Sequence, residues 1–384
     1  MCLNIVKQDL LTFFVVLQFE PKNSMTKNSS LKVAILIPTL NRSDFLIRQL
    51  DYYAKLKSPH PIYIGDSSSP EHIRAARAAI DRLKDMLDIT YKEFPNYNGA
   101  ESAFRLLELV KEKYATFNGD DDFHVPDSLT KCAEFLEENP DYATATSYVV
   151  NFKLKASGAH GEIAALKEYP RPENHCPIAS ERILQHFTHY MVTNISVNRT
   201  DNLRRNWSYF NQTKDKAINE ELLPASLALI DGKAKTLNRL GVIRQMHDKQ
   251  YALAFSYDWI TTEDWLPSFK IFFRIMSERL AEKDGISLEE AKKAMRQACW
   301  IYLKKDLERE YPQAFPGPEK SSSALWKKFR KIMVRIFPFL RTFYRRLWLP
   351  KVRKRIQMHY EVSRKDSKYY KDFQPVLDSL KPRS

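Results

Sequence analysis

The chain has few cysteines, and it lacks any apolar run long enough to cross a membrane as a helix. Four cysteines are scattered over 384 residues with no paired spacing. Such usage is typical of a reducing compartment and excludes a small domain held together by disulfides. A spanning helix needs about 20 consecutive apolar residues, and no stretch of the sequence reaches that length. We therefore expect a cytoplasmic protein.

Residues 1–30 are expected to form an extension before the first strand. The apolar stretch 10–19 is short, and no small-residue cleavage site of a signal peptide follows it. Met25 is an alternative start of translation, which would leave only a short polar leader.

Acidic residues are absent from residues 327–355, a segment that holds twelve Lys or Arg. The whole chain has 61 basic and 47 acidic residues and a formal charge of +14. Because this one segment carries nearly all of that charge, the rest of the chain is close to neutral. No recognised nucleic-acid motif accompanies the charge, so we expect no nucleic-acid binding.

Residues 325–348 have the pattern of a basic amphipathic helix that is interrupted at Pro338. Bulky apolar side chains, among them Trp326, Phe329 and Phe343, repeat at helical spacing, and Lys and Arg fill the other positions. Such helices bind anionic membrane surfaces. We expect peripheral contact with the inner face of the cell membrane. The alternative is a helix docked on the folded domain with a solvated basic face.

Short apolar segments alternate with amphipathic helical patterns in the first third of the chain. Buried strands are predicted for residues 32–38, 61–66, 89–91 and 114–117. Helical spacing follows each of them, over residues 45–53, 73–87, 103–110 and 129–136. This alternation predicts an α/β fold with an open, mostly parallel sheet and helices on both faces.

The pattern changes after residue 140. Further strands are predicted at residues 142–152, 194–198 and 235–246, with a helix at 220–230. Residues 259–311 have a helical pattern with a break at 285–287, and a Pro- and Ser-rich linker follows. We divide the chain into an extension (1–30), an α/β domain (31–250), a helical region (251–315), and a linker with a basic amphipathic tail (316–384).

Three consecutive acids, Asp120, Asp121 and Asp122, directly follow the predicted strand 114–117. Adjacent carboxylates repel one another, and no Lys or Arg stands beside them in the sequence. Mg²⁺ and Mn²⁺ prefer oxygen ligands and commonly join one or two carboxylates to substrate phosphates. The run therefore predicts a divalent-metal site, with a solvated acidic loop as the alternative.

Polar residues also end the first two predicted strands. Asn41 follows the first strand, and Asp66 ends the second. Ligands of open α/β sheets bind at the carboxyl ends of the strands, so we expect both residues to converge on the acidic run. The alternatives are a helix cap for Asn41 and a turn residue for Asp66.

Together, these segments resemble family-2 glycosyltransferases of the GT-A fold. The resemblance rests on Val33–Arg42, Ile64–Ser68, Asn98-Gly99 and Asp120–Asp122, in the family's order. It covers about residues 31–250. Within the family, the chain is most similar to the glycosyltransferase-domain proteins of bacterial surface-polysaccharide clusters.

The resemblance implies an inverting, metal-dependent glycosyltransferase of the hexosyltransferase type. It would transfer a sugar from a nucleotide-sugar donor, such as a UDP-sugar, to a lipid-linked or glycan acceptor. A bound Mn²⁺ or Mg²⁺ would neutralise the leaving diphosphate. A carboxylate would act as general base on the acceptor hydroxyl.

The resemblance also assigns roles to individual positions. Donor binding would fall to Pro38, Thr39, Asn41, Asp66, Asn98, Asp120, Asp121 and Arg244. The metal would be held by Asp120, Asp122 and His247, or by Asp121 and Asp122 in another register.

Glu221 is the candidate base, with Glu220 beside it. This pair stands about 24 residues before Ile243–His247, which resembles the family's Tyr-Arg-x-His segment. A second acidic pair, Glu263-Asp264, is the alternative, but it follows His247 and so breaks the family's order.

Two other classes of protein share parts of this pattern. A nucleotidyltransferase acting on sugar phosphates also has a nucleotide-binding α/β fold with paired acids. It usually carries a Gly-rich loop after the first strand, whereas residues 38–42 contain no glycine. A non-enzymatic basic protein that binds membranes or nucleic acid is the other class, and the near-neutral charge outside residues 327–355 argues against it.

We predict that residues 325–348 hold the protein on anionic membranes. Each Lys or Arg near the surface contributes about 1 kcal/mol, which salt screens, and buried aromatic side chains add a term that salt does not remove. Cosedimentation with anionic vesicles should therefore weaken with salt without vanishing. A truncation at Pro318 should remain in the supernatant. Equal pelleting of both forms would contradict the membrane role.

Overall fold

A computed structural model describes residues 31–247, 256–311 and 361–381 of the chain. The predicted membrane-binding segment 325–348 and the extension 1–30 lie outside the described residues. Within the described ranges, no helix is long and apolar enough to cross a membrane.

Nine strands of the described chain form one sheet, in the order β3-β2-β1-β4-β8-β6-β9-β5, with β7 beside β6. The strands are β1 (Val33–Thr39), β2 (Ile62–Asp66), β3 (Ile89–Glu93), β4 (Tyr114–Phe117), β5 (Phe123–His124), β6 (Tyr142–Leu154), β7 (Ile163–Tyr169), β8 (Val197–Arg199) and β9 (Lys233–Met246). Strands β1 to β4 are mutually parallel, as are β6 and β9, whereas β5, β7 and β8 run antiparallel to their neighbours. The predicted open, mostly parallel sheet is confirmed.

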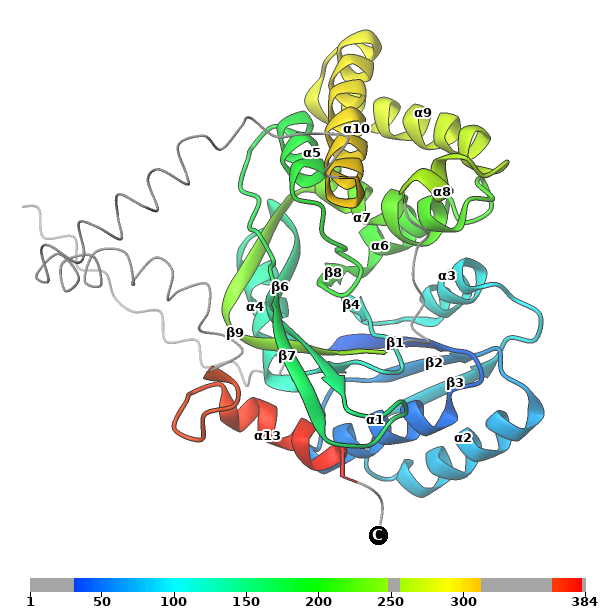
Figure 1. Cartoon of the computed structure of the whole chain (residues 1–384), viewed down its shortest axis with the longest axis vertical. Helices are drawn as coiled ribbons and strands as arrows, with labels where there is room; N and C mark the ends of the chain where they lie inside the picture. The colour runs from blue at the N-terminus through cyan, green and yellow to red at the C-terminus, as the bar shows by residue number, and fades with distance from the viewer. Residues whose placement is uncertain (1–30, 248–255, 312–360, 382–384) are drawn as a thin grey trace, which may run out of the picture. The chain divides into compact units, whose positions relative to one another are not determined.

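Helices cover both faces of this sheet. The helices of the described chain are α1 (Ser43–Lys55), α2 (Pro70–Leu83), α3 (Gly99–Leu109), α4 (Pro126–Glu138), α5 (Ala179–Thr188), α6 (Thr200–Trp207), the π-helix η1 (Ile218–Leu222), α7 (Leu223–Asp231), α8 (Ser256–Ile260), α9 (Trp265–Asp284), α10 (Leu288–Glu310) and α13 (Tyr370–Ser379). Figure 1 shows α1 and α2 on one side of β1–β3 and α3 on the other. The sequence pattern missed β5, β7, α5 and α6.

Strand β1 lies at the centre of the parallel half-sheet because its residues are apolar on both faces. Residues 33–37 are fully buried. Ala34 and Leu36 pack in a cluster with Ala103 and Leu106 of α3. Since β1, β2 and β4 are parallel, their carboxyl ends meet at one edge of the sheet.

The helical region packs on the second half of the α/β domain. Helices α8 to α10 share one apolar core with α5, η1 and α7. The predicted break between the long helices is confirmed, because Gly285 ends α9 with a left-handed φ of 64° and Ser287 forms a capping box with Glu290 at the start of α10.

The end of the chain, residues 361–381, is part of the folded unit. Helix α13 contacts α1 and β9, and Phe373 is buried to 1% exposure. Lys55 Nζ lies 2.9 Å from Asp378 Oδ2, and the Tyr369 hydroxyl donates to Asn238 Oδ1 at 2.9 Å. The amphipathic pattern did not predict this docking.

We predict that Phe373→Ala destabilises the whole folded unit. Truncating a buried Phe removes its packing and leaves a cavity, at a cost of about 3 to 5 kcal/mol. Denaturant unfolding followed by tryptophan fluorescence measures the change, with the exposed Lys371→Ala as the control. An unfolding midpoint equal to that of the control would contradict a structural role for α13.

Candidate functional site

The carboxyl ends of β1, β2 and β4 bring the predicted polar residues together. Thr39 and Asp66 are register partners at the ends of β1 and β2. The Thr39 hydroxyl donates to Asp120 Oδ2, just after β4, at 2.8 Å. These strand ends therefore form one continuous polar edge.

The three acids are buried, with Asp120, Asp121 and Asp122 exposed to 3%, 5% and 3%. Arg42 spans the first two, since its Nη1 lies 2.9 Å from Asp120 Oδ1 and its Nη2 lies 2.8 Å from Asp121 Oδ2. Arg244 Nε lies 3.0 Å from Asp122 Oδ2. The solvated-loop alternative is wrong, because the three acids are buried and pair with two arginines from distant parts of the sequence.

His247 reaches the acidic run from the end of β9. Its Nε2 lies 2.8 Å from Asp121 Oδ2. Both oxygens of Asp122 are already engaged, by Arg244 Nε and by the backbone N–H of Gln245, which donates to Oδ1 at 3.0 Å. His247 is therefore a neighbour of Asp121, although the resemblance had grouped it with Asp120 and Asp122.

The pKa values of the three carboxyls shift in two directions, because burial, mutual repulsion and nearby cations act on them to different extents. Burial, together with the charge of Asp121, raises the pKa of Asp120 and of Asp122 to about 7. Burial also raises the pKa of Asp121, but hydrogen bonds and charges from His247 and Arg42 outweigh it and lower that pKa to about 2. The site thus favours a cation beside Asp121.

The donor types at the acidic run suit a hard divalent cation. Among the residues that the structure describes, no three His, Cys, Asp or Glu side chains converge as a complete metal cluster. Asp121 and His247, whose Oδ2 and Nε2 are hydrogen-bonded at 2.8 Å, nevertheless supply one carboxylate and one imidazole at the same place. Mg²⁺ and Mn²⁺ commonly take only one or two carboxylates and complete their shell with substrate phosphates and water. The residues therefore fit a metal that a substrate helps to bind.

The inner face of α1 holds the backbone of the acidic loop. Arg48 Nη2 donates to the Asp121 carbonyl at 2.8 Å. Gln49 Nε2 donates to the carbonyls of Gly119 at 2.7 Å and Asp122 at 2.5 Å. Sequence reasoning gave these two side chains no role. The sequence feature that could have indicated this role is the presence of two long polar residues on an otherwise apolar helix face.

Asp66 holds the loop that follows β2. Its Oδ1 accepts from the Ser68 N–H at 2.9 Å, and its Oδ2 accepts from the Tyr91 hydroxyl at 2.8 Å. The carboxylate is thus a turn residue that also fixes Tyr91, a residue not singled out from the sequence.

Asn41 and Asn98 have structural partners of their own. Asn41 adopts a left-handed φ of 55°, donates its N–H to Ser68 Oγ at 2.7 Å and accepts from the Ser69 N–H at 2.7 Å. It is therefore not the cap of α1, whose N-cap is Arg42. Asn98 Oδ1 accepts from the Glu101 N–H at 2.9 Å and caps α3. Pro38 is partly buried within β1.

Glu221 lies in the π-helix η1, a conformation found frequently at functional sites. Burial raises its pKa, and the hydroxyl of Tyr190 and the charge of Arg244 oppose that rise. The arginine that opposes the rise is the one that pairs with Asp122. The neighbouring Glu220 turns toward α3, where a Cβ added at Gly99 would meet its Oε1 at 3.0 Å.

Asp215 anchors the turn that carries Glu221. Its Oδ1 accepts from the Ile218 N–H, and its Oδ2 accepts from Trp259 Nε1, both at 2.8 Å. By contrast, the alternative acids Glu263 and Asp264 are exposed at the start of α9. Glu221 is therefore less exposed than either acid of the alternative pair.

Residues 34–207 match the family model described as glycosyl transferase family 2. The matched segment contains β1 to β4 and the acidic run, which are the parts that form the polar edge. Residues 34–207 are therefore a family-2 glycosyltransferase domain. No curated protein sequence is similar enough to the chain to count as a match.

Two solved structures illustrate what the fold is similar to. S. aureus TarS (residues 1–349) in complex with UDP-GlcNAc is 13% identical, with 76% of this chain and 78% of that chain covered and a TM-score of 0.49. The mannosyltransferase PcManGT from Pyrobaculum calidifontis, in complex with GDP-Man and Mn²⁺, is also 13% identical, with 81% and 82% covered and a TM-score of 0.41.

We predict that Gln49→Leu loosens the acidic loop. The substitution removes one hydrogen bond from each of the carbonyls of Gly119 and Asp122, at a total cost of about 1 to 3 kcal/mol. Thermal unfolding should show the loss of stability, and titration with a nucleotide sugar should show weaker binding. The exposed Gln212→Leu serves as the control. Wild-type stability and affinity in Gln49→Leu would show that α1 does not position the loop.

Proposed function

We propose that this glycosyltransferase is inverting and metal-dependent, and that it transfers a sugar, as a hexosyltransferase, from a nucleotide-sugar donor to a lipid-linked or glycan acceptor in cell-surface polysaccharide synthesis. The observation that carries the proposal is the set of three buried carboxylates at the carboxyl ends of parallel strands, with His247 beside Asp121. Buried carboxylates at this edge of an α/β sheet suit a ligand that brings phosphates and a cation.

The nucleotide of the donor would lie along the polar edge. Thr39 and Asp66 at the ends of β1 and β2, with Asn41 and Asn98 in the loops beyond, offer polar groups to a base and ribose. Pro38 would contribute backbone, and Asp120 would face the same side through its bond to Thr39.

Asp121 and His247 would hold the divalent ion, Mn²⁺ or Mg²⁺, with Asp120 and Asp122 as the further candidate ligands. When bound, this ion would neutralise the diphosphate as the bond to the sugar breaks. Arg42 and Arg244 would give charge-assisted hydrogen bonds to the diphosphate oxygens. Both arginines already lie within 3.0 Å of the acidic run.

Glu221 would take the proton of the acceptor hydroxyl. The hydroxyl oxygen would attack the anomeric carbon from the face opposite the diphosphate, which inverts the configuration. Burial suits this role, since it raises the pKa of Glu221 and so strengthens the carboxylate as a base. Glu220, one residue before, would help to shape the acceptor side.

Residues 325–348 would hold the enzyme at the inner face of the membrane, where a lipid-linked acceptor is presented. That segment lies outside the described residues. Its part in the proposal rests on its basic amphipathic sequence.

Donor binding tests the proposed function most simply. Titration calorimetry with UDP-GlcNAc and with GDP-Man, each with and without Mn²⁺, should reveal one donor that binds more tightly with the metal. Asp121→Asn should lose most of that enhancement because it removes the charge beside His247. A wild-type donor affinity that is the same in Mn²⁺ and in excess chelator would overturn the metal dependence. Binding of neither donor would overturn the donor class.

We predict that Glu221→Gln lowers kcat by about 10² to 10⁴ with little change in donor affinity, because a base acts in the transition state. Only the ionised carboxylate can accept a proton. Because the pKa of Glu221 is raised, wild-type kcat should therefore fall on acidification at a higher pH than an ordinary carboxyl would allow. Rate profiles against pH measure both effects. Normal turnover in Glu221→Gln with an inactive Asp264→Asn would move the base to the second acidic pair.

A further inference from the structure

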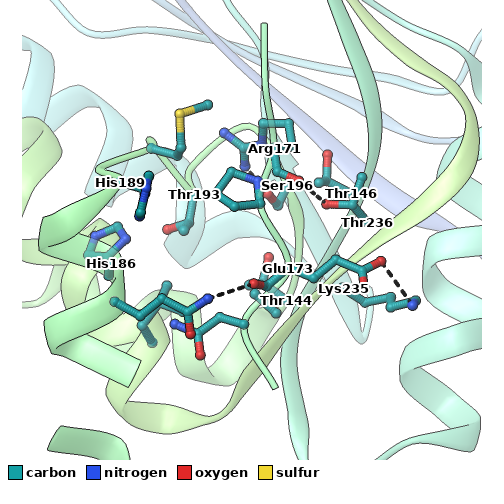
Figure 2. A pocket seen from close by; sticks show the side chains of 16 residues that line it. Thr144, Thr146, Arg171, Glu173, His186, His189, Thr193, Ser196, Lys235 and Thr236 are labelled. Atoms are coloured by element: carbon teal, nitrogen blue, oxygen red, sulfur yellow. Dashed lines mark hydrogen bonds and ion pairs between the residues drawn. The ribbon is translucent and has the colours of Figure 1, made fainter. Parts of the chain in front are cut away.

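A polar cavity of about 40 Å³ lies between the sheet and α5 (Figure 2). Its floor is formed by Thr144 and Thr146 of β6 and by Thr236 of β9, which is the register partner of Thr146. Helix α5 and the loops 171–174 and 189–196 supply the walls. The cavity is separate from the acidic run and has no role in donor binding as proposed above.

Several buried polar atoms around this cavity have no hydrogen-bond partner in the described chain. They are His186 Nε2, Thr144 Oγ1 and Asn174 Oδ1, on residues exposed to only 6%, 2% and 5%. Native proteins rarely bury unpaired polar atoms, because each one costs the free energy of losing its hydrogen bonds to water. Three of them around one cavity indicate a polar occupant.

The side chain of Arg171 indicates that this occupant is an anion. Its guanidinium donates to the Val192 carbonyl and to Ser196 Oγ, both neutral acceptors, and no carboxylate of the described chain forms an ion pair with it. Burial lowers the pKa of Arg171 to about 10, so it is a cation at neutral pH. A sheltered cation without a counter-anion is costly.

The one carboxylate in the cavity wall is already paired. Glu173 lies 2.9 Å from Lys235 Nζ and 2.6 Å from His175 Nε2. Glu173 therefore does not neutralise the charge of Arg171, and no other carboxylate among the described residues lines the cavity. An anion bound in the cavity would supply the missing negative charge.

The cavity also adjoins the turn that carries the proposed base. Met191, Thr193 and Ser196 line the cavity, and from the same loop Asn194 Nδ2 donates to the Glu220 carbonyl at 3.1 Å. Thr193 Oγ1 donates to the Ala225 carbonyl of α7, also at 3.1 Å. A ligand bound to Arg171 would therefore lie beside the loop that contacts the turn carrying Glu221, on the side of the site proposed for the acceptor.

We propose that this cavity binds a phosphate group of the acceptor, with Arg171 as its counter-cation. The assignment rests on the proposed function, because it names the chemical class of the acceptor. Polar groups reach the cavity from the strand floor, from α5 and from the loops, which suits a tetrahedral group with several oxygens better than a planar carboxylate. A volume of about 40 Å³ exceeds the room that one water needs and is far smaller than a sugar-sized pocket.

Titration of the full chain with inorganic phosphate tests the site. A nucleoside diphosphate and Mn²⁺ are kept in excess so that the donor site is filled. Wild type should bind one phosphate, and Arg171→Gln should bind it at least tenfold more weakly. Arg77→Gln, at an exposed arginine paired with Glu93, is the matched control and should bind as wild type does. Absence of phosphate binding to wild type, or equal binding to Arg171→Gln, would overturn the inference.

A second variant covers the case in which Arg171→Gln disturbs the fold, since that guanidinium also holds Val192 and Ser196. Thr144→Val keeps the side-chain shape and removes a hydroxyl that has no protein partner. If the cavity binds phosphate, the variant should bind it several-fold more weakly while its melting temperature stays the same or rises. Unchanged phosphate affinity in a folded Thr144→Val would mean that phosphate binds outside this cavity, which would overturn the inference.

Two further measurements identify the ligand and separate the two proposals. Acetate that binds as tightly as phosphate would replace the phosphate assignment with a carboxylate. A chain that binds a nucleotide sugar but no phosphate overturns this inference alone. A chain that binds phosphate through Arg171 but no nucleotide sugar overturns the proposed function and leaves the anion site in place.

Discussion

The electrostatic balance of three adjacent buried aspartates is the constraint on which the rest of this structure depends. Their charges would not be tolerated inside the protein without cations. Arg42 arrives from the loop after β1, while Arg244 and His247 arrive from the end of β9. The parallel half-sheet and the long strand β9 are therefore held in register at the acidic run as well as by their apolar cores.

This balance also shows how the site could exchange one cation for another. The side chain of Arg42 is exposed to 26%, against 4% and 7% for Asp120 and Asp121, and its guanidinium stacks on Phe45 at 4.6 Å. It is the accessible member of the network. In our account it neutralises the aspartates when no substrate is bound, and it yields Asp121 and His247 to a divalent ion when a nucleotide sugar brings its diphosphate.

Local sequence patterns predicted the parts of the fold that depend on local properties. Strands β1, β2 and β4 are continuous apolar runs, and the acids that follow them meet because parallel strands end at one edge. The pairing of Arg42 with Asp121 joins residues 79 apart, and that of Arg244 with Asp122 joins residues 122 apart, so no local pattern could reveal either.

Other features were not predicted because the same residue in the sequence is compatible with two different physical roles. Asn98, a candidate donor-binding residue, also caps α3, a role that the sequence analysis did not give it. Gln49 was one position of an apolar helix face and proves to hold the acidic loop. Arg171 showed no motif at all, because its significance lies in the missing counter-anion, which only the packing of β6, β9 and α5 defines.

Titration of Mn²⁺ into wild type and Arg42→Gln, followed by calorimetry in the absence of nucleotide, tests the central claim most directly. If Arg42 occupies the place of the metal in the ligand-free protein, its removal should tighten Mn²⁺ binding, and the exposed Arg82→Gln should bind as wild type does. Weaker or unchanged Mn²⁺ binding in a folded Arg42→Gln would contradict the account.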